Sequence, residues 1–370
     1  MHNFLNDIEM PSDIHSWTSV EPVNKGYSAE KKYKLHSDTG EVFLLRISDA
    51  AYYEAKRKEY EIVCKYARTG IRMSSPKAFG TCNQGQNTYM LLSWVEGADL
   101  TEILPSLSEQ EQYQLGRQAG RILRKIHSIP LEEADRPVKT KVDHKLMQLN
   151  RYLNSTVRVP NDEAAVSYIR QNIHKIWNQP PVYLHGDYHP GNLIYSRKTV
   201  KRIDENTQNS GSTGQPTDNS SNAGRPMDNS CNTGQPMDAC MTPVTTDCTS
   251  LGGQIGVIDF NRWEAGDPYE EFYKLESFGI EVSIPYCIGQ IDAYFDDNVP
   301  EIFWETQAVY VAHASLYSIK WAEKFGPENI AGMVKRWNVS YENYDGFTRI
   351  IPKWYNLSSF SSDHCCKLCP

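Results

Sequence analysis

One octapeptide near the middle of the chain, His185-Gly-Asp-Tyr-His-Pro-Gly-Asn192, constrains the fold more than any other feature of the sequence. A short apolar run leads into it, and a later apolar run, 255–258, ends at Asp259. Moving a phosphoryl group requires a carboxylate that orients a hydroxyl, together with carboxylate and amide oxygens that bind metal ions. Asp187, Asn192 and Asp259 supply these groups.

An unusual segment, 203–254, separates the two parts of this pattern. It has no aromatic residue and contains three tandem copies of a ten-residue unit, at 211–220, 221–230 and 231–240. Such a composition buries too little apolar surface to offset the entropy of ordering, which predicts a disordered insertion. One Asp per copy is too few for a calcium site, and the three Cys lack the paired spacing of a zinc site.

The segments that flank this insertion are predicted to be the two arms of a hairpin. Leu193-Ile-Tyr195 and Ile255-Gly-Val-Ile258 are apolar runs of strand length. Asn192 precedes the first arm and Asp259 follows the second, so both are expected at the open end, with the insertion at the other end. Without the insertion about 15 residues remain between them, a normal length for a strand-turn-strand connection.

The first part of the chain has the pattern of an antiparallel sheet with one helix. Asp49 is the expected N-cap of a helix over 49–70, with Ile62 and Val63 on its apolar stripe. Alternation and turn residues predict five strands, at 17–22, 31–35, 41–47, 76–80 and 88–95.

After Gly97 the pattern becomes mostly helical. Ser108 and Glu111 form an expected capping box at the start of a helix over 108–127. Further helices are predicted at 161–178, 267–279, 284–296, 301–325 and 327–337. The fold class is therefore α+β, with an N-terminal lobe at 1–96 and a C-terminal lobe at 97–370 that contains the insertion.

Composition excludes several classes of protein. A net charge of −8 and a pI near 5.7 argue against a nucleic-acid partner, which favours a basic surface. No apolar run is long enough to span a membrane, and the first residues lack the pattern of a signal peptide. Nine Cys in 370 residues suit a reducing compartment, so we expect a cytoplasmic protein. The three Cys of the C-terminal tail are expected in a frayed end rather than a metal site.

The strings LHGDYHPGNLIY and GVIDFNRWEAGDPYEEF resemble the aminoglycoside phosphotransferase family of small-molecule kinases, which includes macrolide and choline kinases. The resemblance spans roughly residues 14–335. It implies a bilobal protein-kinase-like fold, a five-stranded N-terminal lobe with one helix and a mostly helical C-terminal lobe. It also implies Asp187 as the catalytic base, Asn192 and Asp259 as Mg²⁺ ligands, His185 as a support of the catalytic loop, and a structural role for Asp267.

The same resemblance implies how a nucleoside triphosphate is held. Where the family usually has a Lys on the third strand, this sequence has Arg46, which can also bind phosphate but with a different geometry. The loop with Lys25, Gly26 and Ser28 can bring backbone amides to the phosphates, although an ordinary hairpin turn fits the same residues.

Two further elements complete the expected nucleotide site. The helix partner of Arg46 should be Glu59, with Glu54 and Glu61 as competitors. The hinge that contacts the base falls at Ser93-Trp94-Val95, and these side chains do not distinguish ATP from GTP.

The implied reaction transfers the γ-phosphate to a hydroxyl of a small molecule, which is either an antibiotic, such as an aminoglycoside or a macrolide, or a metabolite such as choline, a sugar or an amino alcohol. A catalytically weak nucleotide sensor or scaffold is the alternative outside the enzymes. The oligomeric state stays open. Candidate partners for substrate amines are Glu270, Glu271, Asp292, Asp296 and Asp297, for which solvated helix faces are the simpler interpretation. An apolar acceptor would instead use Trp304, Tyr310, Tyr317 and Trp321.

Overall fold

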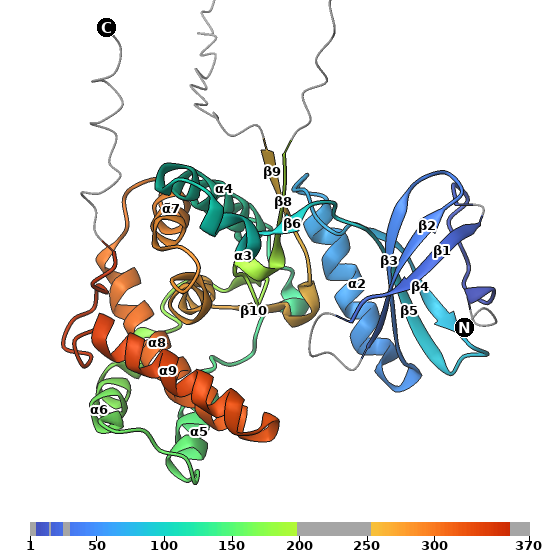
Figure 1. Ribbon diagram of the computed structural model, residues 1–370. Coiled ribbons are helices and arrows are strands. Elements are labelled where there is room, and N and C mark those ends of the chain that lie inside the picture. Colours follow the sequence, from blue (N-terminus) through green and yellow to red (C-terminus); the bar gives the residue numbers. More distant parts are fainter. Residues whose placement is uncertain (1–4, 15, 25–29, 198–252, 356–370) are drawn as a thin grey trace, which may run out of the picture. The chain divides into compact units, whose positions relative to one another are not determined.

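The computed structural model describes residues 5–14, 16–24, 30–197 and 253–355. Its first part is a five-stranded antiparallel sheet with the strand order β1-β2-β3-β5-β4. All five strands agree with those expected from the turn residues. Figure 1 draws them in blue to cyan: β1 (Trp17–Pro22), β2 (Lys31–Ser37), β3 (Val42–Asp49), β4 (Pro76–Cys82) and β5 (Asn87–Ser93).

One face of this sheet forms an apolar core because its strands alternate. Leu35, Phe43 and Leu45 are at most 1% exposed and pack in one cluster. The helix α2 (Tyr53–Ala67) contacts β4 and β5, and Tyr60 stacks on Phe79 with ring centroids 5.4 Å apart. The Asp49 carboxylate accepts a hydrogen bond from the backbone amide of Ala51, but it caps a short 3-10 turn that precedes α2 rather than α2 itself.

The predicted hairpin around the insertion is confirmed. Strand β8 (Leu193–Arg197) pairs antiparallel with β9 (Gly253–Val257), and β6 (Ala98–Asp99) lies on the other side of β8. Leu193 faces Val257 at one end, and Arg197 faces Gly253 at the other. Gly253 and Gln254, which the sequence pattern assigned to the insertion, belong to β9 instead. The rest of the insertion, like the C-terminal Cys cluster, lies outside the described residues.

A second small sheet was not expected. Strand β7 (Val182–Leu184) pairs with β10 (Glu264–Gly266), which follows the Asp259 segment. This pairing joins the chain just before the octapeptide to the chain just after Asp259. A three-residue strand carries too little alternation for a pattern to reveal it.

The remaining described chain is mostly helical. The capping box at Ser108 and Glu111 is present, and the helix it starts runs to His127. The helices are α3 (Leu100–Ile103), α4 (Glu109–His127), α5 (Val142–Leu153), α6 (Asp162–Asn172), α7 (Ile284–Tyr294), α8 (Glu301–Ala322) and α9 (Pro327–Asn343). No helix was expected at α5. The helix predicted over 267–279 is instead a 3-10 helix, Pro268–Phe272, followed by a π-helix, Leu275–Gly279.

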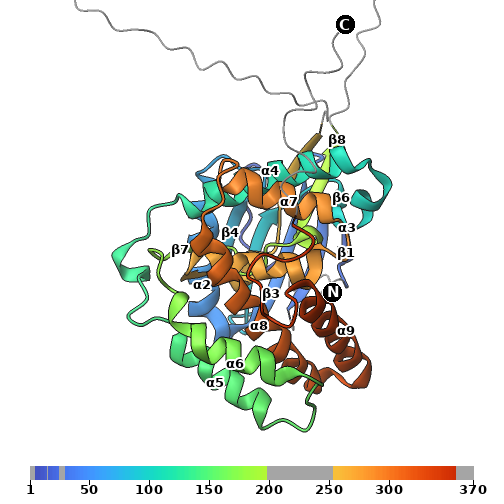
Figure 2. The same cartoon turned by 90° about the vertical axis from the view of Figure 1, so that its left-hand side faces the viewer.

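Glycines let α4 and α7 lie side by side, as Figures 1 and 2 both show. A Cβ on Gly116 would overlap the carbonyl oxygen of Tyr286, and one on Gly289 would overlap that of Tyr113. The two backbones are therefore in contact without intervening side chains. This pair of helices supports the hairpin, because Gln118 of α4 accepts a hydrogen bond from Ile255 of β9 at 2.6 Å.

A second core joins the later helices. Leu149 of α5, Ile169 of α6, Ile319 of α8 and Trp337 of α9 are at most 1% exposed and pack together. Figure 2 shows α5 and α6 next to each other in this region. Among the described residues, no helix has the length and apolar character of a membrane span. The fold is α+β, a five-stranded antiparallel sheet lobe before a helical region, as expected, whereas the lobe boundary at residue 96 stays a prediction.

Candidate active site

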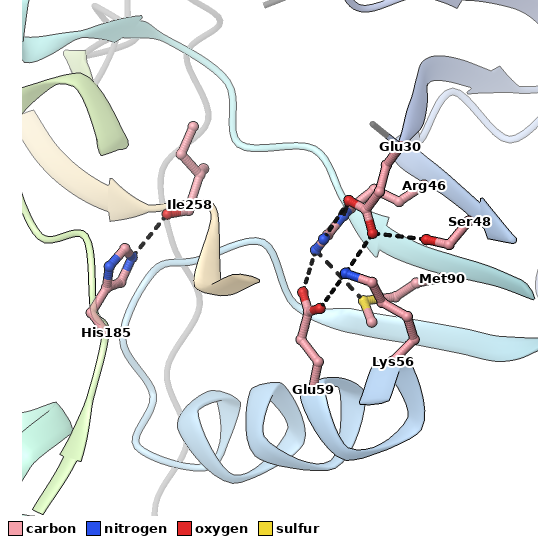
Figure 3. A network of polar contacts seen from close by, with 8 residues as sticks. All are labelled: Glu30, Arg46, Ser48, Lys56, Glu59, Met90, His185 and Ile258. Carbon is pink, nitrogen blue, oxygen red and sulfur yellow. Dashed lines mark hydrogen bonds and ion pairs between the residues drawn. The ribbon is translucent and has the colours of Figure 1, made fainter. Parts of the chain in front are cut away.

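Hydrogen bonds join the octapeptide to the segment that ends at Asp259. The backbone amide of Ile258 donates to the carbonyl oxygen of Asn192 at 3.1 Å. His185 Nε2 donates to the carbonyl oxygen of Ile258 at 3.0 Å, as Figure 3 shows. The other ring nitrogen of His185 accepts from the amide of Asp187 at 3.2 Å. Burial is the main cause that lowers the pKa of His185, so its ring is neutral and supports the loop.

Gly186 fits a position that no side chain can occupy. Its φ is +79°, and a Cβ there would overlap the carbonyl oxygen of Arg262. Its amide donates to Glu271 Oε1 at 2.5 Å. The backbone at this position therefore requires a glycine.

Asp187 is partly buried, and both its backbone oxygen and its carboxylate accept hydrogen bonds. Its backbone oxygen accepts a hydrogen bond from Asn192 Nδ2 at 2.9 Å. Its Oδ1 accepts from Lys274 Nζ at 2.6 Å, while Arg262 Nε lies 3.7 Å from Oδ2. Burial would raise the pKa of Asp187, but Lys274, His189 and Arg262 together outweigh burial, and the pKa lies below its usual range. The carboxylate is therefore ionised at neutral pH.

Asn192 and Asp259 present oxygens that suit a hard divalent cation. The amide nitrogen of Asn192 donates to the backbone oxygen of Asp187, and its Oδ1 accepts no hydrogen bond from the described residues. Asp259 adopts a left-handed conformation, with φ 65° and ψ 61°, and its carboxylate has no hydrogen bond to another described residue. Mg²⁺ keeps several waters and needs only one or two protein oxygens. No group of three or more His, Cys, Asp or Glu that could hold a metal occurs within the described ranges.

Arg46 of β3 lies at the centre of a charged network (Figure 3). Its Nη1 donates to Glu59 Oε1 at 2.6 Å, and its Nε and Nη2 donate to Glu30 Oε2 at 2.8 and 2.6 Å. Lys56 Nζ contacts the other oxygens of Glu30 and Glu59, at 2.6 and 2.7 Å. Two cations and two carboxylates thus form a closed, nearly buried quartet.

The quartet keeps Glu30 and Arg46 charged. Burial would raise the pKa of Glu30, but Arg46 and Lys56 lower it to about 2. Burial would lower the pKa of Arg46, but Glu59 and Glu30 raise it, and Asp259 adds to this effect. The carboxylate of Asp259, the candidate metal ligand, thus acts on the charge of Arg46.

The competing helix carboxylates lie elsewhere. Glu54 and Glu61 both pair with Arg57 on the exposed face of α2. Of the three glutamates considered, Glu59 is the one that contacts Arg46.

The remaining expected nucleotide residues are placed as follows. Ser93 ends β5, and its hydroxyl accepts from the amide of Ser75 at 2.8 Å. The Trp94 ring lies under Lys34 Nζ, 4.8 Å from the centroid, and Val95 is buried. Lys25, Gly26 and Ser28 lie outside the described residues.

The acidic candidates for binding substrate amines are all engaged within the protein. Their partners are Lys145 for Glu270, the Gly186 amide for Glu271, Tyr113 and Tyr355 for Asp292, Arg124 for Asp296 and Arg117 for Asp297. Asp267 is fully buried and accepts from the amides of Trp177 and Tyr269 and from the Tyr310 hydroxyl, which is a structural role. Trp304 and Tyr310 belong to the core, whereas Tyr317 and Trp321 are half-buried.

Comparison with known proteins identifies the family of this chain and the structures that share its fold. A family model described as the phosphotransferase enzyme family (APH) matches residues 19–203, which is half of the chain. The chain belongs to this phosphotransferase family. Among curated proteins, none matches the sequence.

Solved structures of antibiotic kinases share the fold of this phosphotransferase. The GDP complex of aminoglycoside 2′-phosphotransferase-IIIa has a TM-score of 0.55 at 14% identity, covering 88% of this chain and 93% of that one. A GDP and kanamycin complex of an aminoglycoside phosphotransferase gives 0.56 at 14%, covering 89% and 95%. An amicoumacin kinase with AMP-PNP, Ca²⁺ and its substrate gives 0.53 at 11%, covering 91% of each chain.

Three residues of this phosphotransferase site were not found from the sequence. Lys56 stands three positions before Glu59, so helical spacing could have revealed it as a second cation beside that carboxylate. Glu30 immediately precedes β2, where Lys32 faces Arg46, and correct strand register could have placed it. Lys274 is 87 positions from Asp187, and no local pattern links them.

Proposed function

We propose that this phosphotransferase moves the γ-phosphoryl group of a nucleoside triphosphate to a hydroxyl of a small molecule. Asp187 orients the hydroxyl of the acceptor and accepts its proton, and Asn192 and Asp259 hold Mg²⁺. One observation carries the proposal: hydrogen bonds through Ile258 bring the segment of Asp259 against Asn192, in spite of the long insertion between them.

The fit of a divalent cation rests on the side-chain oxygens of Asn192 and Asp259, which accept no hydrogen bond from the part of the chain that the structure describes. When bound, Mg²⁺ would neutralise charge on the phosphates and orient them for transfer. Asn192 and Asp259 would hold the ion and so fix the position of the phosphates. Asp187 orients the attacking oxygen.

Arg46 is proposed to hold the phosphates of the nucleotide. Its carboxylate contacts use three of the five N–H groups of the guanidinium, and another faces Met90 Sδ at 3.9 Å, which is a weak contact. A phosphate oxygen can take the remaining N–H or replace the sulfur. The neighbours bound to GDP or to AMP-PNP with Ca²⁺ support nucleotide binding. ATP and GTP both remain candidates.

An antibiotic is the first candidate acceptor, because kanamycin and amicoumacin are substrates named for the fold neighbours. The engaged carboxylates Glu270, Glu271 and Asp292 favour an acceptor with few amines, such as a macrolide, over a polycationic aminoglycoside. Choline, a sugar or an amino alcohol is the metabolic alternative, and a weak nucleotide sensor is the alternative without turnover. We place the protein in the cytoplasm, where nucleoside triphosphates are available.

A phosphorylation screen of antibiotics and metabolites, run in parallel with ATP and with GTP, tests this function. The purified protein is incubated with Mg²⁺, nucleotide and one acceptor at a time, and phosphorylated product is detected by mass spectrometry. Product that requires both Mg²⁺ and one acceptor class supports the proposal. Tight nucleotide binding without any product across the screen supports the sensor instead.

A further inference from the structure

Lys274 makes the closest side-chain contact of the proposed base. Its ammonium lies 2.6 Å from Oδ1 of Asp187. His189 Nε2 is 3.7 Å from the same oxygen, and Arg262 Nε is 3.7 Å from Oδ2. Both of these distances are too long for a hydrogen bond. Oδ1 is therefore held by Lys274, while Oδ2 accepts no hydrogen bond from the described residues.

The position of Lys274 is fixed by its surroundings. It stands directly before the π-helix Leu275–Gly279, whose Ile280 amide donates to the Leu275 carbonyl at 2.9 Å. The ammonium lies 5.2 Å from the ring centroids of both Tyr273 and Phe278. The ring of Phe278 in turn packs on that of His189, with centroids 5.3 Å apart. Interruptions of this kind in a helix often occur at functional sites.

Stability alone does not explain this lysine. Lys274 is 5% exposed, and removing an ammonium from water carries a free-energy cost that an ion pair often fails to recover. An apolar side chain of similar volume would fill the same space. The charge therefore points to a requirement of Asp187 rather than of the fold.

We propose that Lys274 is a positioning residue: by holding Oδ1 of Asp187, it leaves Oδ2 directed at the acceptor hydroxyl. The inference rests on the proposed function. During transfer the acceptor oxygen forms a bond to the γ-phosphorus as the bond from that phosphorus to the β,γ-bridging oxygen breaks. The electron pair of that bond leaves with the nucleoside diphosphate, and the hydroxyl proton passes to Oδ2. Lys274 acts only through the carboxylate.

The test compares Lys274→Met and Lys274→Arg with the wild-type protein, using the acceptor that the screen identifies. Lys274→Met is expected to lower kcat at least about tenfold, within the range that proton transfer contributes. The KM for the nucleotide should change less than about twofold, because Lys274 does not contact the quartet around Arg46. Lys274→Arg retains the charge and should recover a large part of kcat.

Lys145→Met is the matched control. Lys145 is also a lysine with little exposure and a carboxylate partner, Glu270, and its ammonium lies 5.5 Å from the Tyr310 centroid, but it does not contact Asp187. Its replacement should lower stability and leave kcat within about threefold of wild type. An equal loss of kcat in the Lys145 and Lys274 variants would show that the effect is general and would overturn the inference.

A double variant keeps the test decisive if Lys274→Met alone does not fold. Asp187→Asn with Lys274→Met leaves neither member of the pair charged, and circular dichroism checks its fold. If Lys274 acts through Asp187, adding Lys274→Met to Asp187→Asn causes no further loss of kcat. A further loss of tenfold or more would contradict it. A wild-type protein that transfers no phosphate refutes the proposed function itself, whereas an active wild type with an equally active Lys274→Met refutes only this inference.

Discussion

At the scale of single residues, the site depends on a backbone position with no room for a side chain. Gly186 combines a positive φ with a close approach to the carbonyl of Arg262. Its neighbour Asp187 is oriented by the same turn. The conformation of the loop is therefore a requirement for the chemistry proposed here, as well as for the fold.

Gly186→Ala should destabilise the protein by more than about 2 kcal/mol, because the strain of a positive φ, about 1–2 kcal/mol, adds to the overlap with Arg262. Urea denaturation measures the free energy of unfolding. Gly40→Ala is the matched control, since Gly40 has φ +83° and no atom within 4 Å of the place where the added methyl group would lie, so it carries the strain alone. Equal losses in the two variants would contradict the account of Gly186.

Arg46→Lys should raise the KM for the nucleotide about tenfold, a loss of about 1.4 kcal/mol. A lysine cannot bind Glu30 through two nitrogens while contacting Glu59, so its ammonium is no longer held for the phosphates. Steady-state kinetics with varied nucleotide measures the change. The control, Arg57→Lys on the exposed face of α2, should leave KM as it is. An unchanged KM in both variants would remove Arg46 from the phosphate site.

At the scale of elements, the helices and strands that could be predicted are those whose sequence pattern lies within a short stretch of the chain. The capping box at Ser108 and the hairpin arms depend on residues close in the chain, or on an insertion that is obvious from its composition. The pairing of β7 with β10 and the contact of Lys274 with Asp187 join segments about 80 residues apart, for which no spacing rule exists. The π-helix was missed because its first turns have the same apolar pattern as an α-helix.

Stability should depend on pH through Glu271, in the 3-10 helix that contacts Gly186. Burial is the main cause that raises its pKa from 4.5 to about 8, and its buried Oε2 has no hydrogen-bond partner among the described residues. Because the folded-state pKa is the higher one, the group stabilises the fold fully below pH 4.5, and this contribution is lost as pH rises through 8.

Glu271→Gln stays neutral and should gain stability relative to wild type as pH rises, by at most about 1.4 kcal/mol per pH unit. Urea denaturation of both proteins at about pH 5.5 and 7.5 measures this difference. If the variant and the wild type differ by the same free energy at both pH values, Glu271 does not hold its proton in the folded state.

The pairing of β8 with β9 predicts that the insertion is not required for folding or for phosphoryl transfer. Arg197 and Gly253 face each other at its end, so a two-residue Asn-Gly turn can replace residues 198–252. The shortened protein should fold with a free energy of unfolding within about 1 kcal/mol of wild type and keep its phosphoryl transfer. An insoluble or inactive product would show that the segment contributes to the fold or to the reaction.

At the scale of the whole molecule, a sheet lobe holds the Arg46–Glu59 pair and a helical region holds Asp187. The family match and the shared fold of antibiotic kinases agree with a sheet lobe followed by a helical region. Sequence could place the chain in its family, because the octapeptide and the Asp259 segment are specific. The sequence could not reveal the acceptor, because the acidic residues that it offered as substrate ligands, such as Glu270 and Glu271, bind other groups of the protein.

The most direct measurement compares phosphoryl transfer by wild type and by Asp187→Asn, with saturating Mg²⁺, nucleotide and the acceptor from the screen. The substitution keeps the backbone oxygen that Asn192 contacts and removes only the carboxylate charge. We expect wild type to form the phosphorylated acceptor. The variant should lose at least about 100-fold in kcat, with little change in nucleotide binding. Equal turnover by the two proteins would contradict it.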